Sequence, residues 1–419
     1  MIDLTTILTH VFFFVALYFE VFLLITFFER FNTASTKEKK IKRYPTVAIA
    51  VPAYNEEIAV VKTINSLLAV NYPKDKLTII GVDDGSKDGT WQAMQQFANN
   101  QQVVLHTQPN GGKHAAVNWG IEHSDAEIFG CLDADSFVDP EALNEIIRTF
   151  ESDPELMAVT PAIKISNPQS IFQYIQKAEY DLSIFIRRTF SFLDGLFVTP
   201  GPLSLFKREV FEQIGLYKGA HNTEDLEMAL RMQSRHMRIG NAHTAFVYTH
   251  GPRTFRALIK QRIRWVYGFL KNLIDYRFMI FRPKYGNIGM LILPITMFSI
   301  VTALYFFYLF LFGLTRIIWH MYVKYTAVGI TPPSTPTIDW FYINTQSATI
   351  LTIILIALSV WLVVIGKQLS KENRIFSYDL LLYVLFYGFL APVWLMQALY
   401  RVVVSKKTSW TGEIDAGGR

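Results

Sequence analysis

Long apolar runs near the two ends of the chain enclose a region with a shorter and more regular pattern. Residues 7–28 form the first run, and three further runs cover about residues 287–318, 347–366 and 378–404. A helix that spans the hydrocarbon core of a bilayer needs about 20 predominantly apolar residues, and each run reaches that length. The pattern therefore predicts an N-terminal transmembrane helix and a C-terminal transmembrane region.

The first run has two interpretations. A cleaved signal peptide is one, but the run is long, no basic residue precedes it and no small-residue cleavage site follows it, so we expect a retained anchor. Glu20 is costly inside a bilayer, and we expect it to face protein. The linker that follows is basic and favours the cytoplasmic side of the membrane. Its charges are Lys37, Lys39, Lys40, Lys42 and Arg43.

Residues 46–253 alternate short apolar runs with stretches of helical periodicity. The runs at 47–51, 77–82 and 128–132 are typical of buried parallel strands, and residues 56–69 and 114–123 have the spacing of amphipathic helices. This alternation predicts an α/β domain with a doubly wound, Rossmann-like sheet. In such a sheet, ligands bind at the carboxyl ends of the strands.

Two helical stretches, at residues 170–190 and 254–281, mix apolar with basic side chains. Both could lie in the membrane interface, and an ordinary amphipathic helix of the domain explains the pattern equally well. The predicted division of the chain is a transmembrane helix at 1–30, a basic linker at 31–45, the α/β domain at 46–253, an interfacial helix at 254–285, a transmembrane region at 286–404 and a tail at 405–419.

The number of apolar runs leaves the membrane topology open. A Pro- and Thr-containing loop at 331–337 and a charged loop at 367–374 separate the last three runs. A cytoplasmic domain followed by three crossings would place Lys406 and Lys407 outside, against the positive-inside tendency. Either one segment does not cross simply, with a break at Gly388 and Pro392, or the tail is exterior.

Composition supports a membrane protein. Of the 419 residues, 51% are hydrophobic and 15% aromatic, and the mean hydropathy is +0.23. The net charge of +5 lies mostly beside the apolar runs, which favours contact with lipid headgroups over binding of nucleic acid. The single cysteine, Cys131, excludes an intrachain disulfide and fits a reducing cytosol; we expect it to be a small buried residue.

Polar side chains follow the predicted strands. Pro52, Tyr54, Asn55 and Glu56 end the first strand in a turn that opens a helix and that could hold a nucleoside, although a capped helix start is the plain alternative.

Asp83 and Asp84 end the second strand. A carboxylate there can accept a hydrogen bond from a uracil N–H or a ribose hydroxyl. The string Asp-Asp-Gly-Ser is also common in turns. Lys113 follows two glycines at the start of a helix and could contact phosphate or uracil.

Asp133 and Asp135 follow the strand at 128–132 and point to one side of its end. Mg²⁺ or Mn²⁺ bound to a diphosphate keeps a few carboxylate ligands and takes phosphate oxygens for the others. Such an ion neutralises the charge that develops on a departing nucleotide. The sequence therefore predicts a metal-assisted diphosphate site at this edge.

Glu224 and Asp225 open a predicted helix at 226–233. In an inverting transfer a carboxylate must take the proton from the acceptor hydroxyl, and Asp225 is our choice of base. The alternative is a capping box, with Thr223 as the cap and the acids in a first helical turn.

The interfacial helix contains Gln261, Arg262, Arg264 and Trp265. Gln261 and Trp265 are one helical turn apart, so an amide and an indole can hold a sugar while an arginine offsets diphosphate charge. A basic helix on lipid headgroups would explain Arg262 but not the three acidic sites upstream.

Taken in order, these strings resemble the processive family 2 glycosyltransferases, the membrane synthases of cellulose, chitin, hyaluronan and poly-N-acetylglucosamine. The resemblance covers nearly the whole chain and implies a GT-A type fold. It also implies roles for single residues. Asp84 and Asp133 would contact uridine, Asp135 would bind metal, Asp225 would be the base, and Gln261, Arg264 and Trp265 would hold the acceptor and the diphosphate.

Two segments bear on this resemblance. Residues 200–208 are similar to the acceptor-side segment of hyaluronan and chitin synthases, but Pro200 stands where those proteins usually have serine or cysteine, which puts the acceptor in doubt. Residues 406–412 are similar to a Trp-containing gating segment of some relatives, which would require a cytoplasmic tail.

We therefore expect a multi-pass cell-membrane protein with a cytoplasmic catalytic domain that is in contact with membrane lipid. We expect it to use Mg²⁺ or Mn²⁺ and to transfer the sugar of a UDP-sugar, with UDP-N-acetylglucosamine as the expected donor, onto a growing polysaccharide. Accessory secretion subunits stay an open class of partner. One alternative is transfer of a single sugar to a lipid acceptor such as polyprenyl phosphate. Another is a catalytically silent nucleotide-sugar sensor or assembly subunit.

Overall fold

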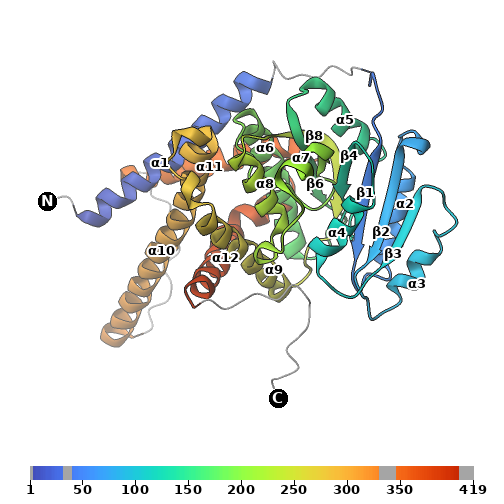
Figure 1. Cartoon of the computed structure of the whole chain (residues 1–419). Helices are drawn as coiled ribbons and strands as arrows, with labels where there is room; N and C mark the ends of the chain where they lie inside the picture. Colours follow the sequence, from blue (N-terminus) through green and yellow to red (C-terminus); the bar gives the residue numbers. More distant parts are fainter. Residues whose placement is uncertain (1–2, 32–39, 330–345, 405–419) are drawn as a thin grey trace.

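The computed structural model describes residues 3–31, 40–329 and 346–404 (Figure 1). Several sequence-based expectations concern segments outside these residues. They are the basic residues Lys37 and Lys39 of the linker, the loop at 331–337 and the tail at 405–419 with its similarity to a gating segment.

An eight-stranded mixed sheet forms the centre of the domain, with the strand order β3-β2-β1-β4-β7-β6-β8-β5. The strands are β1 (Val47–Ala53), β2 (Leu77–Asp83), β3 (Val103–Thr107), β4 (Ile128–Cys131), β5 (Phe137–Val138), β6 (Leu156–Ile165), β7 (Leu205–Lys207) and β8 (Arg238–Thr249).

The first four strands are parallel, which confirms the doubly wound sheet that the sequence predicts. Strand β7 then runs antiparallel to both β4 and β6, and β8 continues parallel to β6. The reversal at β7 has no counterpart in the sequence-based prediction, because three residues give too short a pattern to show strand direction.

Helices cover both faces of the sheet. The shorter ones are α2 (Ala59–Leu68), α3 (Thr90–Gln95), α4 (Lys113–Glu122), α5 (Ala142–Ser152), α7 (Arg208–Ile214) and α8 (Glu224–Ser234). Two longer ones, α6 (Ile171–Phe192) and α9 (Phe255–Asp275), lie between the sheet and the apolar helices of the chain ends (Figure 1). Side-chain caps from Ser170 and Thr254 fix where these two helices begin.

Among the described residues, four helices are long and apolar enough to cross a membrane, and they correspond to the four predicted runs. They are α1 (Leu4–Phe31), α10 (Leu293–Val328), α11 (Ser347–Leu369) and α12 (Tyr378–Val403). Glu20 in α1 faces protein as expected, because its Oε1 accepts a hydrogen bond of 2.6 Å from the hydroxyl of Ser359 in α11.

Helix α12 runs unbroken through Gly388 and Pro392, so the break that one topological alternative placed there is not present. The helix packs along both α6 and α9. Near its start, Tyr378 contacts Tyr174 of α6, with ring centroids 5.8 Å apart. Further on, its side chains Trp394, Leu395 and Ala398 form one apolar cluster with Ile259 and Ile263 of α9. The apolar sides of α6 and α9 are therefore packed on protein.

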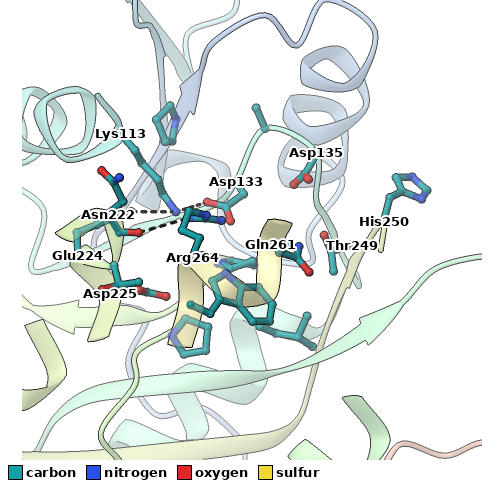
Figure 2. A pocket seen from close by; sticks show the side chains of 18 of the residues that line it. Lys113, Asp133, Asp135, Asn222, Glu224, Asp225, Thr249, His250, Gln261 and Arg264 are labelled. Atoms are coloured by element: carbon teal, nitrogen blue, oxygen red, sulfur yellow. Dashed lines mark hydrogen bonds and ion pairs between the residues drawn. The ribbon is translucent and has the colours of Figure 1, made fainter. Parts of the chain in front are cut away.

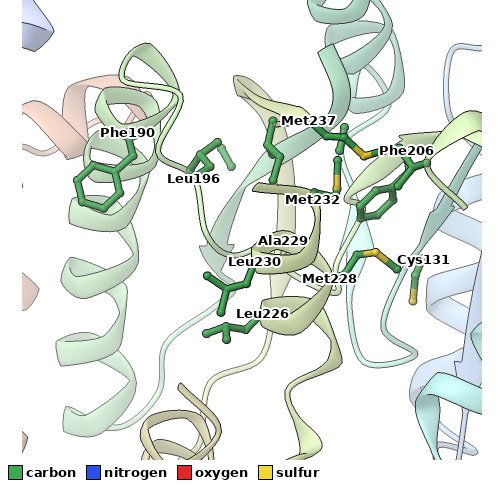
Figure 3. Close-up of a cluster of buried hydrophobic side chains, with 14 of the residues drawn as sticks. Cys131, Phe190, Leu196, Phe206, Leu226, Met228, Ala229, Leu230, Met232 and Met237 are labelled. Carbon is green, nitrogen blue, oxygen red and sulfur yellow. The ribbon is translucent and has the colours of Figure 1, made fainter. Parts of the chain in front are cut away.

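The hydrophobic core continues from the sheet into the membrane helices. On one face of the sheet, a single cluster joins Phe206 of β7, the methionines of α8 and Phe185 of α6 with Phe27 of α1 and Ile365 of α11. Figure 3 shows the part of this cluster around α8, with Met228 close to Cys131. Cys131 is buried, as expected, and burial raises the pKa of its thiol well above the usual range.

Candidate active site

A cavity of about 500 Å³ lies at the carboxyl ends of β1 and β4, where α6, α8 and α9 close it. We call it the catalytic cavity. It brings together all but three of the residues that the sequence predicts for the site. Those that line it are Pro52, Tyr54, Glu56, Lys113, Asp133, Asp135, Glu224, Asp225, Gln261, Arg262, Arg264 and Trp265.

Asn55, Asp83 and Asp84 are the three that do not line the cavity. Asn55 adopts a left-handed backbone conformation (φ 56°), and its side-chain oxygen accepts a hydrogen bond of 2.8 Å from the backbone N–H of Lys87. This bond ties the turn after β1 to the turn after β2. Asp83 is 3% exposed and accepts hydrogen bonds from the Ser86 N–H and the Thr107 hydroxyl.

Asp84 is 2% exposed and organises the loop that leads to α4. Its carboxylate accepts hydrogen bonds from the Gln108 side chain and from the backbone N–H groups of Gly111 and Gly112, at 2.8 to 2.9 Å. These bonds hold the loop directly before Lys113. Contact of Asp83 or Asp84 with a nucleotide stays a prediction, and within the chain both act on the shape of the turns.

Lys113 joins acids from two distant parts of the chain. Its Nζ lies 2.5 Å from Asp133 Oδ1 and 3.6 Å from Glu224 Oε1, as Figure 2 shows. Burial alone would lower the pKa of Lys113, but the charges of Asp133 and Glu224 outweigh it and hold the pKa above its usual value. The lysine therefore stays charged and fixes α8 against the end of β4.

Gly201 leaves room for this ion pair. A Cβ atom at this position would lie 2.3 Å from Lys113 Nζ and 2.9 Å from Asp133 Oδ1. Pro200 beside it, the departure from the usual pattern of this segment, accepts a hydrogen bond of 2.6 Å through its carbonyl oxygen from the hydroxyl of Ser204. The Pro-Gly-Pro segment thus forms a wall of the cavity that contributes no side-chain hydroxyl or thiol at positions 200 to 202.

The acids next to β4 favour a bound cation. Burial and the charge of Asp133 raise the pKa of Asp135 to about 6. Burial and the charges of Asp135 and Asp88 raise the pKa of Glu56 to about 7. Within the described part of the chain, no three acidic, histidine or cysteine side chains form a ready-made ion site. The donor set instead suits a hard cation that takes its remaining ligands from phosphate oxygens.

Glu224 and Asp225 follow a strained turn. Ala220, His221 and Asn222 all have positive φ (21°, 56° and 62°), a conformation that non-glycine residues rarely adopt. Helix α9 holds this turn, because the Arg264 guanidinium donates to the Asn222 carbonyl at 3.3 Å and the His221 ring pairs with an acid of α9.

Thr223 occupies the N-cap position of α8, but its side chain makes no capping bond. Its hydroxyl donates to the Ala220 carbonyl (3.2 Å) and accepts from the amide of Asn272 in α9 (2.9 Å). The capping-box alternative is therefore wrong. The threonine instead links the strained turn to α9, and Gly268 allows the two segments to approach closely.

The electrostatic setting of Asp225 suits a proton acceptor. Burial and the charge of Glu224 raise its pKa to about 6, while Lys113 and Arg264 counteract this rise. The carboxylate is thus ionised near neutral pH and has an affinity for protons well above that of a free aspartate, which general base catalysis requires.

The four site residues that the sequence predicts in α9 have different surroundings. Gln261 and Trp265 line the catalytic cavity, and the buried Gln261 Oε1 has no hydrogen-bond partner among the described residues. Arg264 lies near Lys113 and Asp133 (Figure 2). Arg262 is turned toward α6, where its Nη2 lies 2.7 Å from Glu179 Oε2.

Sequence reasoning missed the contribution of α6. Tyr180, Ser183 and Arg187 line the cavity together with Glu179. Ser183 follows Tyr180 by three residues, and Arg187 follows Ser183 by four. This helical spacing makes the polar stripe recognisable in the sequence. The pattern fits an interfacial helix and an ordinary amphipathic helix equally well, and only the packing of α9 and α12 against α6 shows that the stripe is enclosed. Thr249 and His250, at the end of β8, also line the cavity and were not predicted.

A second cavity of about 470 Å³ lies between α9, α10 and α12. We call it the membrane-side cavity. Its wall is largely apolar and includes the aromatic residues Phe197, Phe269, Tyr387 and Trp394. Five residues line both cavities, so the two adjoin at these side chains. They are Glu179, Thr223, Asp225, Arg262 and Trp265.

The antiparallel β7 lies next to the strand that precedes Asp133 and Asp135 and distinguishes this sheet from a simple doubly wound sheet. Together with the acidic crevice at the strand ends, it defines a GT-A type fold joined to apolar helices. Residues 48–215 match the model for glycosyl transferase family 2.

Relatives extend the similarity beyond the matched segment. The chain is 30% identical over 257 residues to the poly-β-1,6-N-acetyl-D-glucosamine synthase of Staphylococcus aureus strain COL, which covers 61% of this chain and 62% of the relative. It is 28% identical over 301 residues to the synthase of the same name from Staphylococcus epidermidis, over 71% of this chain and 72% of the relative. The chain thus matches less than two thirds of the length of the first relative.

Among solved structures, the mannosyltransferase PcManGT from Pyrobaculum calidifontis in complex with GDP-Man and Mn²⁺ resembles the whole chain. The TM-score is 0.59 at 17% identity, over 95% of this chain and 99% of that one. At this identity the likeness shows the fold alone.

Proposed function

We propose that the protein is a membrane-embedded, inverting glycosyltransferase that polymerises a UDP-sugar into a β-linked polysaccharide and guides the product between its membrane helices. The observation that carries the proposal is the contact between the two cavities at Asp225 and Trp265. A sugar that receives the next unit beside Asp225 can extend from there into the aromatic wall of the membrane-side cavity, where ring faces stack on sugars.

The donor is assigned to the edge formed by β1 and β4. Pro52 and Tyr54 line the part of the catalytic cavity next to β1 and would take the nucleoside, and Lys113 and Arg264 offer positive charge to a diphosphate. Asp135, with Asp133 beside it, would hold a Mg²⁺ or Mn²⁺ ion, which stabilises the negative charge on the leaving diphosphate. The names of the relatives support UDP-N-acetylglucosamine as the donor.

The acceptor is assigned to Gln261 and Trp265. The buried Gln261 oxygen, for which the described part of the chain offers no hydrogen-bond donor, supports this, since a sugar hydroxyl would supply one. Asp225 takes the proton from the acceptor hydroxyl while the hydroxyl oxygen attacks the anomeric carbon. The bond from that carbon to the diphosphate breaks, UDP leaves with the electron pair, and the configuration inverts. Glu224 assists through its charge, which raises the pKa of Asp225.

The catalytic domain is placed on the cytoplasmic side of the cell membrane. Lys40, Lys42 and Arg43 lie between α1 and β1 in the sequence and favour that side. The packing of α12 along α6 and α9 supports a position of this helix close to the domain and not simply across the bilayer.

The full-length protein in detergent tests the proposal. With UDP-N-acetylglucosamine and Mn²⁺ or Mg²⁺, we expect UDP release and a product of many sugar units. Asp225→Asn should abolish both, and Glu122→Gln, at an exposed acid on the end of α4, should abolish neither. Full turnover by Asp225→Asn would show that the assigned base is wrong.

Transfer of a single sugar to a lipid acceptor is the second candidate. The aliphatic part of the membrane-side cavity, with Val266, Ile300 and Leu395, favours it because an acyl or prenyl chain would fit there. Product length separates the two. A glycolipid with one sugar and no polymer would replace the first proposal with the second.

A further inference from the structure

Trp265 lies at the boundary of the catalytic and membrane-side cavities. An acceptor that extends from one cavity into the other must pass this indole. The orientation of the ring therefore decides where the terminal sugar rests relative to Asp225, and the side chains that fix the ring become important for transfer.

A chain of contacts from three helices lies behind the indole. The guanidinium carbon of Arg262 lies 4.4 Å from the centroid of the Trp265 ring, within the range of a cation–π contact. Arg262 Nη2 lies 2.7 Å from Glu179 Oε2 of α6. The hydroxyl of Tyr387 in α12 donates to Glu179 Oε1 at 3.3 Å. Thus α12 contacts α6, α6 contacts Arg262, and Arg262 lies against Trp265.

The charge of Arg262 is already matched. The residue is 5% exposed, and the charge of Glu179 holds the pKa of the guanidinium above its usual value although burial opposes this. A guanidinium paired in this way offers little net charge to a diphosphate. Arg264 instead donates to the Asn222 carbonyl, and its charge acts on Asp225. The two arginines of α9 therefore have separate environments.

Retention of a buried ion pair calls for a reason other than stability. Well-packed apolar side chains usually replace such a pair at no loss of stability, because the ions must be desolvated. Here the Arg262–Glu179 pair lies against Trp265, whose ring lines both cavities. The Arg262 guanidinium carbon lies 4.4 Å from the ring centroid, and a charged group at this distance adds a cation–π attraction that an apolar side chain would not supply.

We propose that Glu179, Arg262 and Tyr387 are positioning residues that hold the Trp265 indole as the platform for the terminal acceptor sugar at the entrance to the membrane-side cavity. The sugar as occupant rests on the proposed function, whereas the positioning of the indole does not.

Fluorescence tests the positioning without any turnover. The emission of Trp265 is isolated by subtracting the spectrum of Trp265→Phe from that of the wild type, and the same subtraction is made in a Glu179→Gln background. We expect Glu179→Gln to raise acrylamide quenching of the isolated signal about twofold, because the ring loses its fixed neighbour. Asp379→Asn, which removes the buried pair with Lys367 outside both cavities, serves as the matched control and should not change it.

Kinetics test the consequence for the acceptor. With UDP-N-acetylglucosamine and a soluble β-1,6-linked N-acetylglucosamine oligosaccharide, Glu179→Gln should raise the KM for the oligosaccharide about tenfold and change the KM for the donor by less than about twofold. Arg262→Lys retains the charge but not the planar contact, and should fall between Glu179→Gln and the wild type. In the Trp265→Phe background, Glu179→Gln should have a smaller effect, since the platform is already altered.

The outcomes are separable. Unchanged quenching in Glu179→Gln, or an equal change in Asp379→Asn, overturns the positioning proposal whatever the activity. Altered quenching with an unchanged acceptor KM overturns the platform role. If the wild type transfers no sugar while quenching responds as expected, the proposed function fails and the positioning of Trp265 stands.

Discussion

Replacing Gly268 by alanine will separate α9 from the turn that precedes Glu224 and Asp225. A Cβ atom at this position would lie 2.3 Å from Thr223 Oγ1 and 2.4 Å from its Cγ2, whereas ordinary contact begins at 3.4 Å, so one of the two segments must move by about 1 Å. Thr223 cannot rotate away, because its hydroxyl is bonded to both Ala220 and Asn272.

The cost divides between stability and catalysis. Overpacking of this kind destabilises a protein by about 1–3 kcal/mol. A displacement of about 1 Å in a catalytic group lowers the rate about 100-fold. We therefore expect a small loss of thermal stability, a large loss of kcat and nearly unchanged binding of UDP, because the residues assigned to the donor lie mainly on the opposite side of the cavity, at β1 and β4.

The assay is UDP release by Gly268→Ala, with UDP binding measured separately. Gly313→Ala is the matched control, since a Cβ atom at Gly313 in α10 meets nothing within 4 Å. Adding Thr223→Ala to Gly268→Ala removes both short contacts and should restore part of the turnover. If Gly268→Ala alone turns over within about twofold of the wild type, the position of Asp225 does not depend on α9 and the reasoning is refuted.

Three further predictions follow from the same site. Burial and Glu224 raise the pKa of Asp225 to about 6, and only the ionised form accepts a proton; kcat should thus be level above pH 7 and fall about tenfold per unit below pH 6 in a pH–rate profile. Lys113→Met leaves Asp133 and Glu224 without their shared cation, which should destabilise the protein by about 3–5 kcal/mol in thermal unfolding and weaken UDP binding in calorimetry. Asp84→Asn turns an amide toward N–H donors, which should cost about 1–3 kcal/mol and lower the unfolding temperature even without nucleotide.

Much of the site could be predicted because parallel strands bring their carboxyl ends to one edge. Asp133 and Asp135 follow one such strand, so their place beside the turn after β1 followed from the alternation of strand and helix. Gln261 and Trp265 shared a helix face by spacing alone. Apolar runs of the right length were also enough to predict the four apolar helices of the described residues, because a membrane span is a local property of sequence.

Other features depend on contacts between distant segments. The partner of Arg262 is Glu179, 83 residues earlier, and nothing in the local pattern of α9 points to it. Asp84 lies in a string that suggested nucleotide contact, yet its oxygens are bound by a loop more than 20 residues further on. The direction of β7 and the enclosure of the polar face of α6 likewise arise only when the whole chain is packed.

The joint hydrophobic cluster of sheet and apolar helices means that the protein is not a soluble module tethered to an anchor. Excising residues 46–285 would remove Phe27, whose ring centroid lies 5.0 Å from that of Phe185, and Ile365 of the same cluster. The apolar side of the excised domain would then face water and favour aggregation. A thinner or stiffer bilayer that displaces these apolar helices would strain the sheet through the shared cluster. The lipid composition would then affect the rate of the reaction.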